Sequence, residues 1–154
     1  MMVNKIKSQK KKFLISFLII LLILALTGCW IMPGFPEWMM AEESVYYYWK
    51  AIINRQYELA KYYCIPGGVW YNKVDEWEEY INVNSEGEIS LAIYGPTFYE
   101  QTEVIGDTAI AYTKIIVHKI AFPDNYKIYI DALAFEYEIE LIKQNYPPGD
   151  WELK

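Results

Sequence analysis

One segment near the end of the chain restricts the possible folds more than any other. Between residues 126 and 143, apolar and acidic side chains alternate: Leu133, Phe135, Tyr137, Ile139 and Leu141 form one series, and Glu136, Glu138 and Glu140 form the other. Successive side chains of a β-strand point to opposite faces. The segment therefore predicts a strand with one buried and one solvated face, as in an antiparallel sheet that is covered on one side.

Two amphipathic helices are predicted before the strands. Residues 41–63 repeat apolar side chains at intervals of three and four, the period of one helix face, and a Pro-Gly-Gly stretch at 66–68 ends the pattern. Residues 71–83 form a shorter second helix, with Asn72 as its predicted cap. Its predicted core face carries Val74, Trp77 and Ile81.

The remaining segments read as strands. They cover residues 89–94, 98–105, 108–122, 126–143 and 151–153, and turn signals such as Gly95-Pro96 and Gly106-Asp107 separate them. Helices followed by strands favour an α+β fold. We expect one α+β domain over residues 41–154, with its N-terminal helices packed on one face of a curved antiparallel sheet.

Two short motifs resemble the nuclear transport factor 2-like superfamily. In the first helix, Asn54, Tyr57 and Ala60 are similar to an "n-x-x-y-x-x-A" stretch of that family, and a final strand begins at Gly149-Asp150-Trp151. The resemblance implies a cone in which helices cover a curved sheet. It also implies that Trp151 is buried, and that any ligand pocket lies between the helices and the sheet.

The first residues have the three parts of an export signal. Five lysines precede an apolar run over residues 13–26, and small residues follow it. Leu26-Thr27-Gly28-Cys29 then resembles the bacterial lipobox, which implies that residues 1–28 are removed and that Cys29 receives a diacylglycerol. An uncleaved anchor helix over residues 13–32 is the alternative. Either form predicts a cell-membrane protein whose domain faces outward.

A short tether is predicted between the lipid and the domain. Pro33, Gly34 and Pro36 interrupt regular structure within residues 29–40. The aromatic side chains of this segment suit the membrane–water boundary. In the alternative interpretation, residues 38–40 already belong to the core of the domain.

Charge excludes one class of partner. The net charge is −6, and removal of the five leader lysines brings it to −11. Such a surface disfavours nucleic acid, whose backbone is itself negative. If Cys29 carries lipid, Cys64 is the one remaining thiol, so no intramolecular disulfide is possible. We expect Cys64 to be a small apolar residue at the end of a helix; an intermolecular disulfide or a reactive thiol is the alternative.

Aromatic residues suggest a binding pocket. They make up 18% of the chain, with fifteen tyrosines, and most of them are expected in the core. Tyr46, Tyr47 and Tyr48 cannot all point inward from one helix, because successive residues are about 100° apart. The predicted pocket comprises Tyr48, Trp49, Ile52 and Asp131, and it would take a small apolar ligand.

No catalytic set stands out in the sequence. His118 is the one histidine, and it lies within a predicted strand. Asp131 interrupts an apolar stretch and would act as a general base if it were buried. No metal or cofactor site is specified. The sequence therefore predicts a noncatalytic lipoprotein that binds a small apolar ligand or another envelope protein. The alternatives are a ketosteroid-isomerase-like enzyme that uses Asp131, and an accessory subunit of an envelope transporter or cell-wall enzyme.

Overall fold

The structure is a computed structural model that describes residues 35–123, 126–144 and 151–154. The predicted signal peptide at residues 1–28, the predicted lipid-attachment residue Cys29 and the first half of the tether lie outside these ranges. So does the predicted turn before Trp151. No helix of the described ranges is long and apolar enough to cross a membrane.

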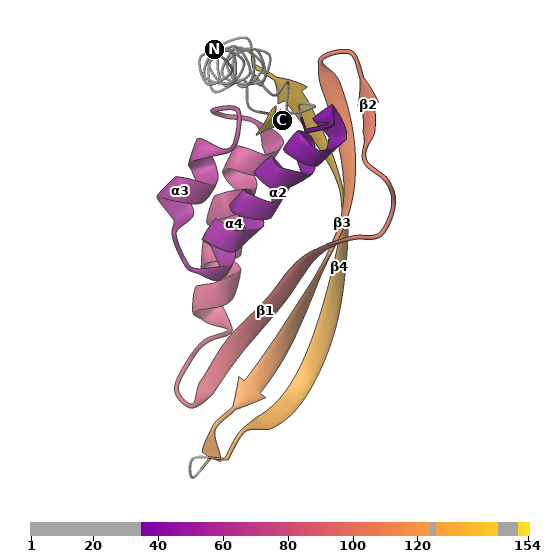
Figure 1. The fold of residues 1–154 in the computed structure, drawn as a ribbon. Coiled ribbons are helices and arrows are strands. Elements are labelled where there is room, and N and C mark those ends of the chain that lie inside the picture. The colour runs from indigo at the N-terminus through magenta and orange to yellow at the C-terminus, as the bar shows by residue number, and fades with distance from the viewer. Residues whose placement is uncertain (1–34, 124–125, 145–150) are drawn as a thin grey trace, which may run out of the picture. The chain divides into compact units, whose positions relative to one another are not determined.

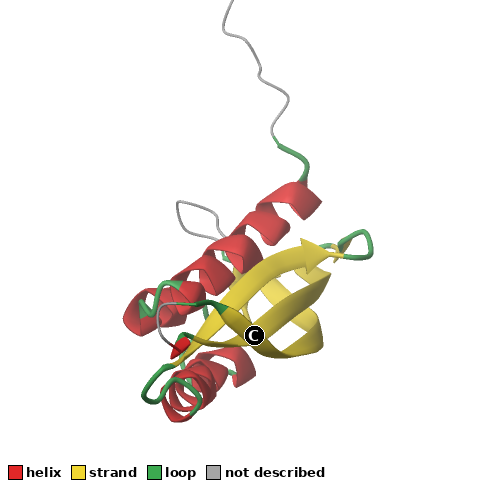
Figure 2. Ribbon diagram, turned by 90° about the horizontal axis from the view of Figure 1, so that it is seen from below, coloured by secondary structure: helices red, strands yellow, loops and turns green. Residues whose placement is uncertain are grey.

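Three helices pack against one antiparallel sheet (Figure 1). The helices are α2 (Glu37–Ile53), α3 (Tyr57–Tyr62) and α4 (Val69–Val83), and the strands are β1 (Ile89–Phe98), β2 (Glu103–Ile105), β3 (Thr108–Ala121), β4 (Ile128–Lys143) and β5 (Trp151–Leu153). The strand order is β1-β3-β4-β5, and β2 also pairs with β3. The sheet curls, and the helices lie against one of its faces (Figure 2). The predicted α+β class is thus confirmed, and the architecture is consistent with a nuclear transport factor 2-like cone.

The predicted first helix is divided in two. Its residues form α2 and α3, and Arg55 between them has a left-handed φ of 58°. The amide of Gln56 donates to the carbonyl of Ala51, and that of Arg55 donates to Ile52. This pair of hydrogen bonds is the Schellman motif that ends helices, where glycine is the usual left-handed residue. Because arginine occupies that place, composition gives no sign of the break.

Other element boundaries also differ from the prediction. Helix α2 begins at Glu37, so the predicted tether contains its first turn. Met40 packs against the core, whereas Phe35 and Met39 are exposed. Helix α4 begins at Val69 behind Gly68, and Asn72 is therefore not its cap. Strand β1 continues to Phe98 through a register shift at Gly95-Pro96, and the predicted strand over residues 98–105 is reduced to β2.

Gly95 is required where β1 bends. Its φ is +124°, a conformation that side chains rarely adopt, and an added Cβ would lie 2.9 Å from the carbonyl oxygen of Lys114. Glycine accepts both constraints because it has no Cβ. The irregularity lets one strand bend while it stays paired with β3.

The core lies between the helices and the upper part of the sheet in Figure 1. Buried and half-buried side chains alternate along β3 from Thr108 to His118, and the buried positions begin with three small side chains, Ala109, Ala111 and Thr113. Small residues on the strand leave room for the large rings of α2, which contacts β3. Trp151 is buried on β5, which also contacts α2, so its predicted burial is confirmed.

The lower part of the sheet extends beyond the helices (Figure 1). On the predicted buried face of β4, burial therefore decreases from Leu141 toward Leu133. Ile139 and Leu141 are fully buried, Phe135 and Tyr137 are half-buried, and Leu133 is 47% exposed. The change in exposure follows from where the helices end, which the alternating pattern does not encode.

Candidate functional site

The structure does not gather the four predicted pocket residues around one cavity. Tyr48, Trp49 and Ile52 come together on the inner face of α2, each with no exposed surface, and they belong to the hydrophobic core. Asp131 is exposed on β4. The prediction that at least one of the three consecutive tyrosines is exposed is confirmed, since Tyr46 and Tyr47 are exposed while Tyr48 is buried.

Aromatic rings fill the interior of the cone. The ring of Trp49 lies 5.2 Å from Tyr48, 5.3 Å from Trp77 and 5.4 Å from Tyr137, measured between ring centroids. Trp70 lies 5.3 Å from Tyr137. Most of these pairs meet edge to face, the arrangement that the ring quadrupoles favour. The predicted pocket is therefore occupied by the chain's own side chains.

An open groove lies beside this filled interior, between α4 and β4. Its volume is about 350 Å³, within the range of small-ligand sites. Two rings from each element line it, together with an ion pair: Lys73, Glu76, Trp77, Tyr80, Phe135 and Tyr137. We call this feature the α4–β4 groove.

Sequence spacing explains why these residues meet. The four α4 residues occupy positions i, i+3, i+4 and i+7, which form one stripe of a helix. Phe135 and Tyr137 are two residues apart on β4 and so point to the same face of the sheet. Their rings are stacked with an interplanar angle of 5° and centroids 6.5 Å apart. Both elements thus place an aromatic surface against the same space.

Contacts between the aromatic rings fix the positions of the side chains that line the groove. Phe135 lies 5.4 Å from Trp77 and 6.0 Å from Tyr80, both in edge-to-face contact. Trp77 and Tyr80 are themselves 5.4 Å apart. Each ring is thereby fixed by at least one other ring, which lowers the conformational entropy that binding would remove.

One ion pair lies among the residues that line the groove. Lys73 Nζ lies 3.2 Å from a carboxylate oxygen of Glu76 and 5.8 Å from the centroid of Tyr137. The Glu76 side chain is 69% exposed, as expected for the solvated face of this helix. An exposed pair of this kind contributes little stability. Its significance is that both signs of charge are available to a ligand next to an apolar surface.

The groove tyrosines remain neutral at physiological pH. Burial raises the pKa of Tyr137 to about 12, with a further contribution from Glu76, while a hydrogen bond from Trp77 acts in the opposite direction. Burial and the nearby Asp131 raise the pKa of Tyr80. Both hydroxyl groups therefore keep their protons and can donate hydrogen bonds.

Asp131 lies on the helix-side face of the sheet but below the helices. It pairs with Lys119 on β3, and the register shifts immediately beyond that pair. Its carboxylate accepts a hydrogen bond of 2.8 Å from the amide of Ala132. The side chain is thus engaged with the backbone of its own strand, outside the α4–β4 groove.

The other sequence candidates lie apart from the groove. His118 packs on the opposite face of the sheet, between the rings of Tyr94 at 5.2 Å and Tyr129 at 5.4 Å. Cys64 is buried, and its thiol donates to the carbonyl of Ala60. Burial raises the pKa of that thiol to about 12. In the described ranges, no three His, Cys, Asp or Glu side chains form a group that could hold a metal ion.

The sequence pattern predicts the correct face for some groove residues but does not predict the groove. Trp77, Phe135 and Tyr137 were each predicted on a buried face, and all of them do face the interior. The helical stripe that also contains Lys73 and Tyr80 is visible in the sequence. The sequence pattern does not predict how far α4 lies from β4, because that distance depends on how α2 packs against α4 and the sheet.

Comparison with known proteins supports the fold alone. No protein-family model matches the chain, and no curated protein sequence does. Among solved structures, it is similar to a conserved protein from Planctomyces limnophilus DSM 3776, with a TM-score of 0.50 and 16% sequence identity. The similarity covers 75% of this chain and 89% of that protein. At this identity the shared feature is the arrangement of helices on a curled sheet.

Proposed function

We propose that this chain is a lipid-anchored, extracytoplasmic lipoprotein with a nuclear transport factor 2-like domain, and that it binds the apolar group of a ligand in the α4–β4 groove without catalysis. One observation carries the binding proposal. Four fixed aromatic rings and one ion pair line an open groove. Binding sites typically combine such apolar walls with a few polar groups.

The noncatalytic part of the proposal rests on where the two catalytic candidates from the sequence, Asp131 and His118, lie. A general base must come within hydrogen-bond reach of the proton that it removes. Asp131 is exposed and hydrogen-bonded to its own strand, and His118 lies on the other face of the sheet. Neither side chain lines the groove. We therefore assign the groove to recognition.

A small aromatic probe tests the groove. N-acetylphenylalanine amide presents one apolar ring, and at about 0.3 kcal/mol per non-hydrogen atom it should bind with a Kd of about 1 mM. Saturation-transfer NMR on the detergent-solubilised mature protein measures the contact. We expect Tyr80→Ala to abolish the transfer and Tyr62→Ala to leave it intact, because Tyr62 is exposed on α3, outside the groove. Equal transfer in both variants would remove the groove from the account.

The anchor is tested separately, by mass. The lipobox-like Leu26-Thr27-Gly28-Cys29 motivates it. Intact-mass measurement of the protein extracted from membranes should give a chain that begins at Cys29 and carries added acyl mass. Cys29→Ser should accumulate as the uncleaved precursor. A wild-type chain that retains residues 1–28 and has no acyl adduct would disprove the lipid anchor while leaving the groove untouched.

A further inference from the structure

Strand β4 has an open edge beside the α4–β4 groove. On one side it pairs with β3 from Ile128 to Ile142, with one register shift at Ile130. On the other side, β5 pairs only with residues 141–143, and the amide of Lys154 extends this pairing to the carbonyl of Glu140. Between residues 128 and 139, no described residue pairs with that second side.

The pairing with β5 fixes which backbone groups face outward. The Glu140 carbonyl points toward β5, and successive residues of a strand direct their amide and carbonyl groups to alternate sides. The groups of Ala134, Glu136 and Glu138 therefore point to the open side. Unpaired strand edges of this kind are templates for an additional strand.

The lower end of the same edge is closed. Asp131 accepts the outward amide of Ala132, and the register shift places one additional β4 residue, Ile130, opposite β3. Capped amides and bulges are the means by which proteins keep edge strands from pairing. The accessible edge is thereby restricted to Ala134–Glu138, the part that borders the groove.

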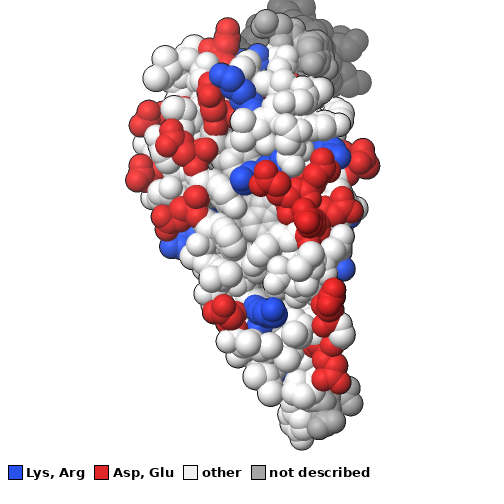
Figure 3. Space-filling view, turned by 180° about the vertical axis from the view of Figure 1, so that it is seen from behind, with Lys and Arg blue, Asp and Glu red and all other residues white. Residues whose placement is uncertain are grey.

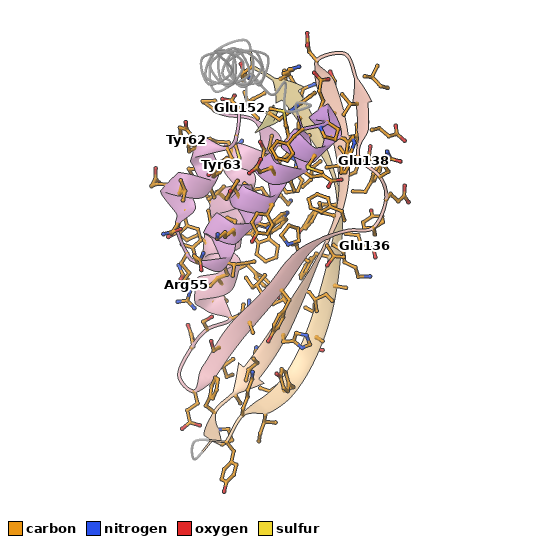
Figure 4. The ribbon with its side chains drawn as sticks, in the orientation of Figure 1. Arg55, Tyr62, Tyr63, Glu136, Glu138 and Glu152 are labelled. Carbon is orange, nitrogen blue, oxygen red and sulfur yellow. The ribbon has the colours of Figure 1, made fainter. Side chains whose placement is uncertain are left out.

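The two faces of this edge have opposite chemistry. On the helix side, Phe135 and Tyr137 line the groove. On the other side, Glu136 and Glu138 project away from the helices (Figure 4). Lys114 pairs with Glu136 at 2.8 Å, whereas Glu138 has no ion-pair partner among the described residues. Figure 3 shows acidic side chains toward both margins of the molecule, with a few basic side chains between them.

We propose that the edge from Ala134 to Glu138 binds an extended peptide segment in which apolar and basic residues alternate, and that this segment adds to the sheet as a strand. Its apolar side chains enter the α4–β4 groove, and its basic side chains face Glu136 and Glu138. The proposal rests on the proposed binding function and names its ligand class. Backbone hydrogen bonds provide affinity in such complexes, and alternate side chains provide specificity.

Charge argues for a peptide over a second copy of the chain. Antiparallel self-pairing of two β4 edges centred on Glu136 would place Glu136 against itself and each Ala134 against Glu138. Like charges directly opposite each other destabilise paired strands. A basic strand replaces this repulsion with attraction at the same positions.

A seven-residue peptide of sequence KFKVKFK, acetylated and amidated, serves as the probe. Hydrogen exchange of the solubilised mature protein is followed by NMR. In the free protein we expect slow exchange at the amides of Phe135 and Tyr137, which face β3, and fast exchange at Ala134, Glu136 and Glu138. Saturating peptide should slow these three amides by at least about tenfold. No slowing at saturation would overturn the proposal.

Two altered peptides separate edge pairing from simple attraction. N-methylation of alternate amides keeps the charge and removes the hydrogen bonds, and it should weaken binding by at least about tenfold. Replacing each lysine with glutamate should abolish binding. An N-methylated peptide that binds as well as its parent would overturn the proposal, and so would an acidic peptide that does.

Variants of the protein complete the test. Glu138→Lys should weaken the KFKVKFK complex by about fivefold, whereas the matched control Glu58→Lys, which changes a 93% exposed side chain on α3, should leave it unchanged. Equal weakening by both variants would point to net charge alone and overturn the site.

If N-acetylphenylalanine amide still binds while KFKVKFK shows no edge protection, only this inference fails. If neither ligand binds, the proposed function fails as well.

Discussion

Truncation of Trp49 tests whether the interior of the cone is filled by side chains or contains a pocket. Trp49 has no exposed surface and makes ring contacts with Tyr48, Trp70, Trp77 and Tyr137. Replacing a buried tryptophan with alanine costs about 3–5 kcal/mol. The loss of ring contacts, each worth about 0.5–1.5 kcal/mol, places Trp49→Ala at the upper end of this range. A domain stabilised by only about 5–15 kcal/mol would then be close to unfolding.

Trp49→Phe should be much milder, for a reason that the structure provides. The indole N–H of Trp49 is buried without a hydrogen-bond partner among the described residues. Phenylalanine therefore sacrifices packing volume but no hydrogen bond, and we expect a loss of about 1–2 kcal/mol. Urea denaturation followed by far-ultraviolet circular dichroism measures both variants. Tyr62→Ala, at a 69% exposed position, is the control and should change stability by less than about 0.5 kcal/mol. A loss below about 1 kcal/mol for Trp49→Ala would refute the filled interior.

Three further predictions concern single positions. Arg55→Gly should stabilise the domain by about 0.5–1 kcal/mol in the same urea assay, because Arg55 holds a left-handed conformation that glycine adopts without strain; destabilisation would mean that α2 does not end there. Cys64 should react with iodoacetamide at pH 8 about a thousandfold more slowly than a free thiol, since a pKa of about 12 leaves little thiolate; rapid labelling of the native protein, detected by mass spectrometry, would show that the thiol is accessible. Asp131→Ala should expose the amide of Ala132 and increase self-association in sedimentation experiments, and sedimentation equal to that of the wild type would show that this cap does not protect the edge.

The fold class was predictable from the sequence because it depends on periodicity. Alternation along residues 133–141 and the helical stripe of Val74, Trp77 and Ile81 identify the faces that become buried. Burial of Trp151 was implied by the resemblance of Gly149-Asp150-Trp151 to the end of nuclear transport factor 2-like domains, and the structure confirms it. These signals are local, and the structure preserves them.

The site was less predictable because it depends on long-range packing. The sequence places Tyr48, Trp49 and Ile52 on one helix face, but it does not say whether that face lines a cavity or fills it. The break at Arg55 has no glycine to mark it. The half-exposure of Phe135 likewise depends on how far α4 extends over the sheet. Each of these outcomes is decided by contacts between distant segments.

The indole N–H signals of the six tryptophans provide the most direct test of the α4–β4 groove. The protein is labelled with nitrogen-15 and titrated with N-acetylphenylalanine amide while its two-dimensional NMR spectrum is recorded. We predict that the Trp77 indole signal moves most, because its ring forms a wall of the groove and its N–H bonds to Tyr137. The signal of Trp151, buried on β5, should stay in place. A stationary Trp77 signal, with saturable shifts at other tryptophans, would contradict the account.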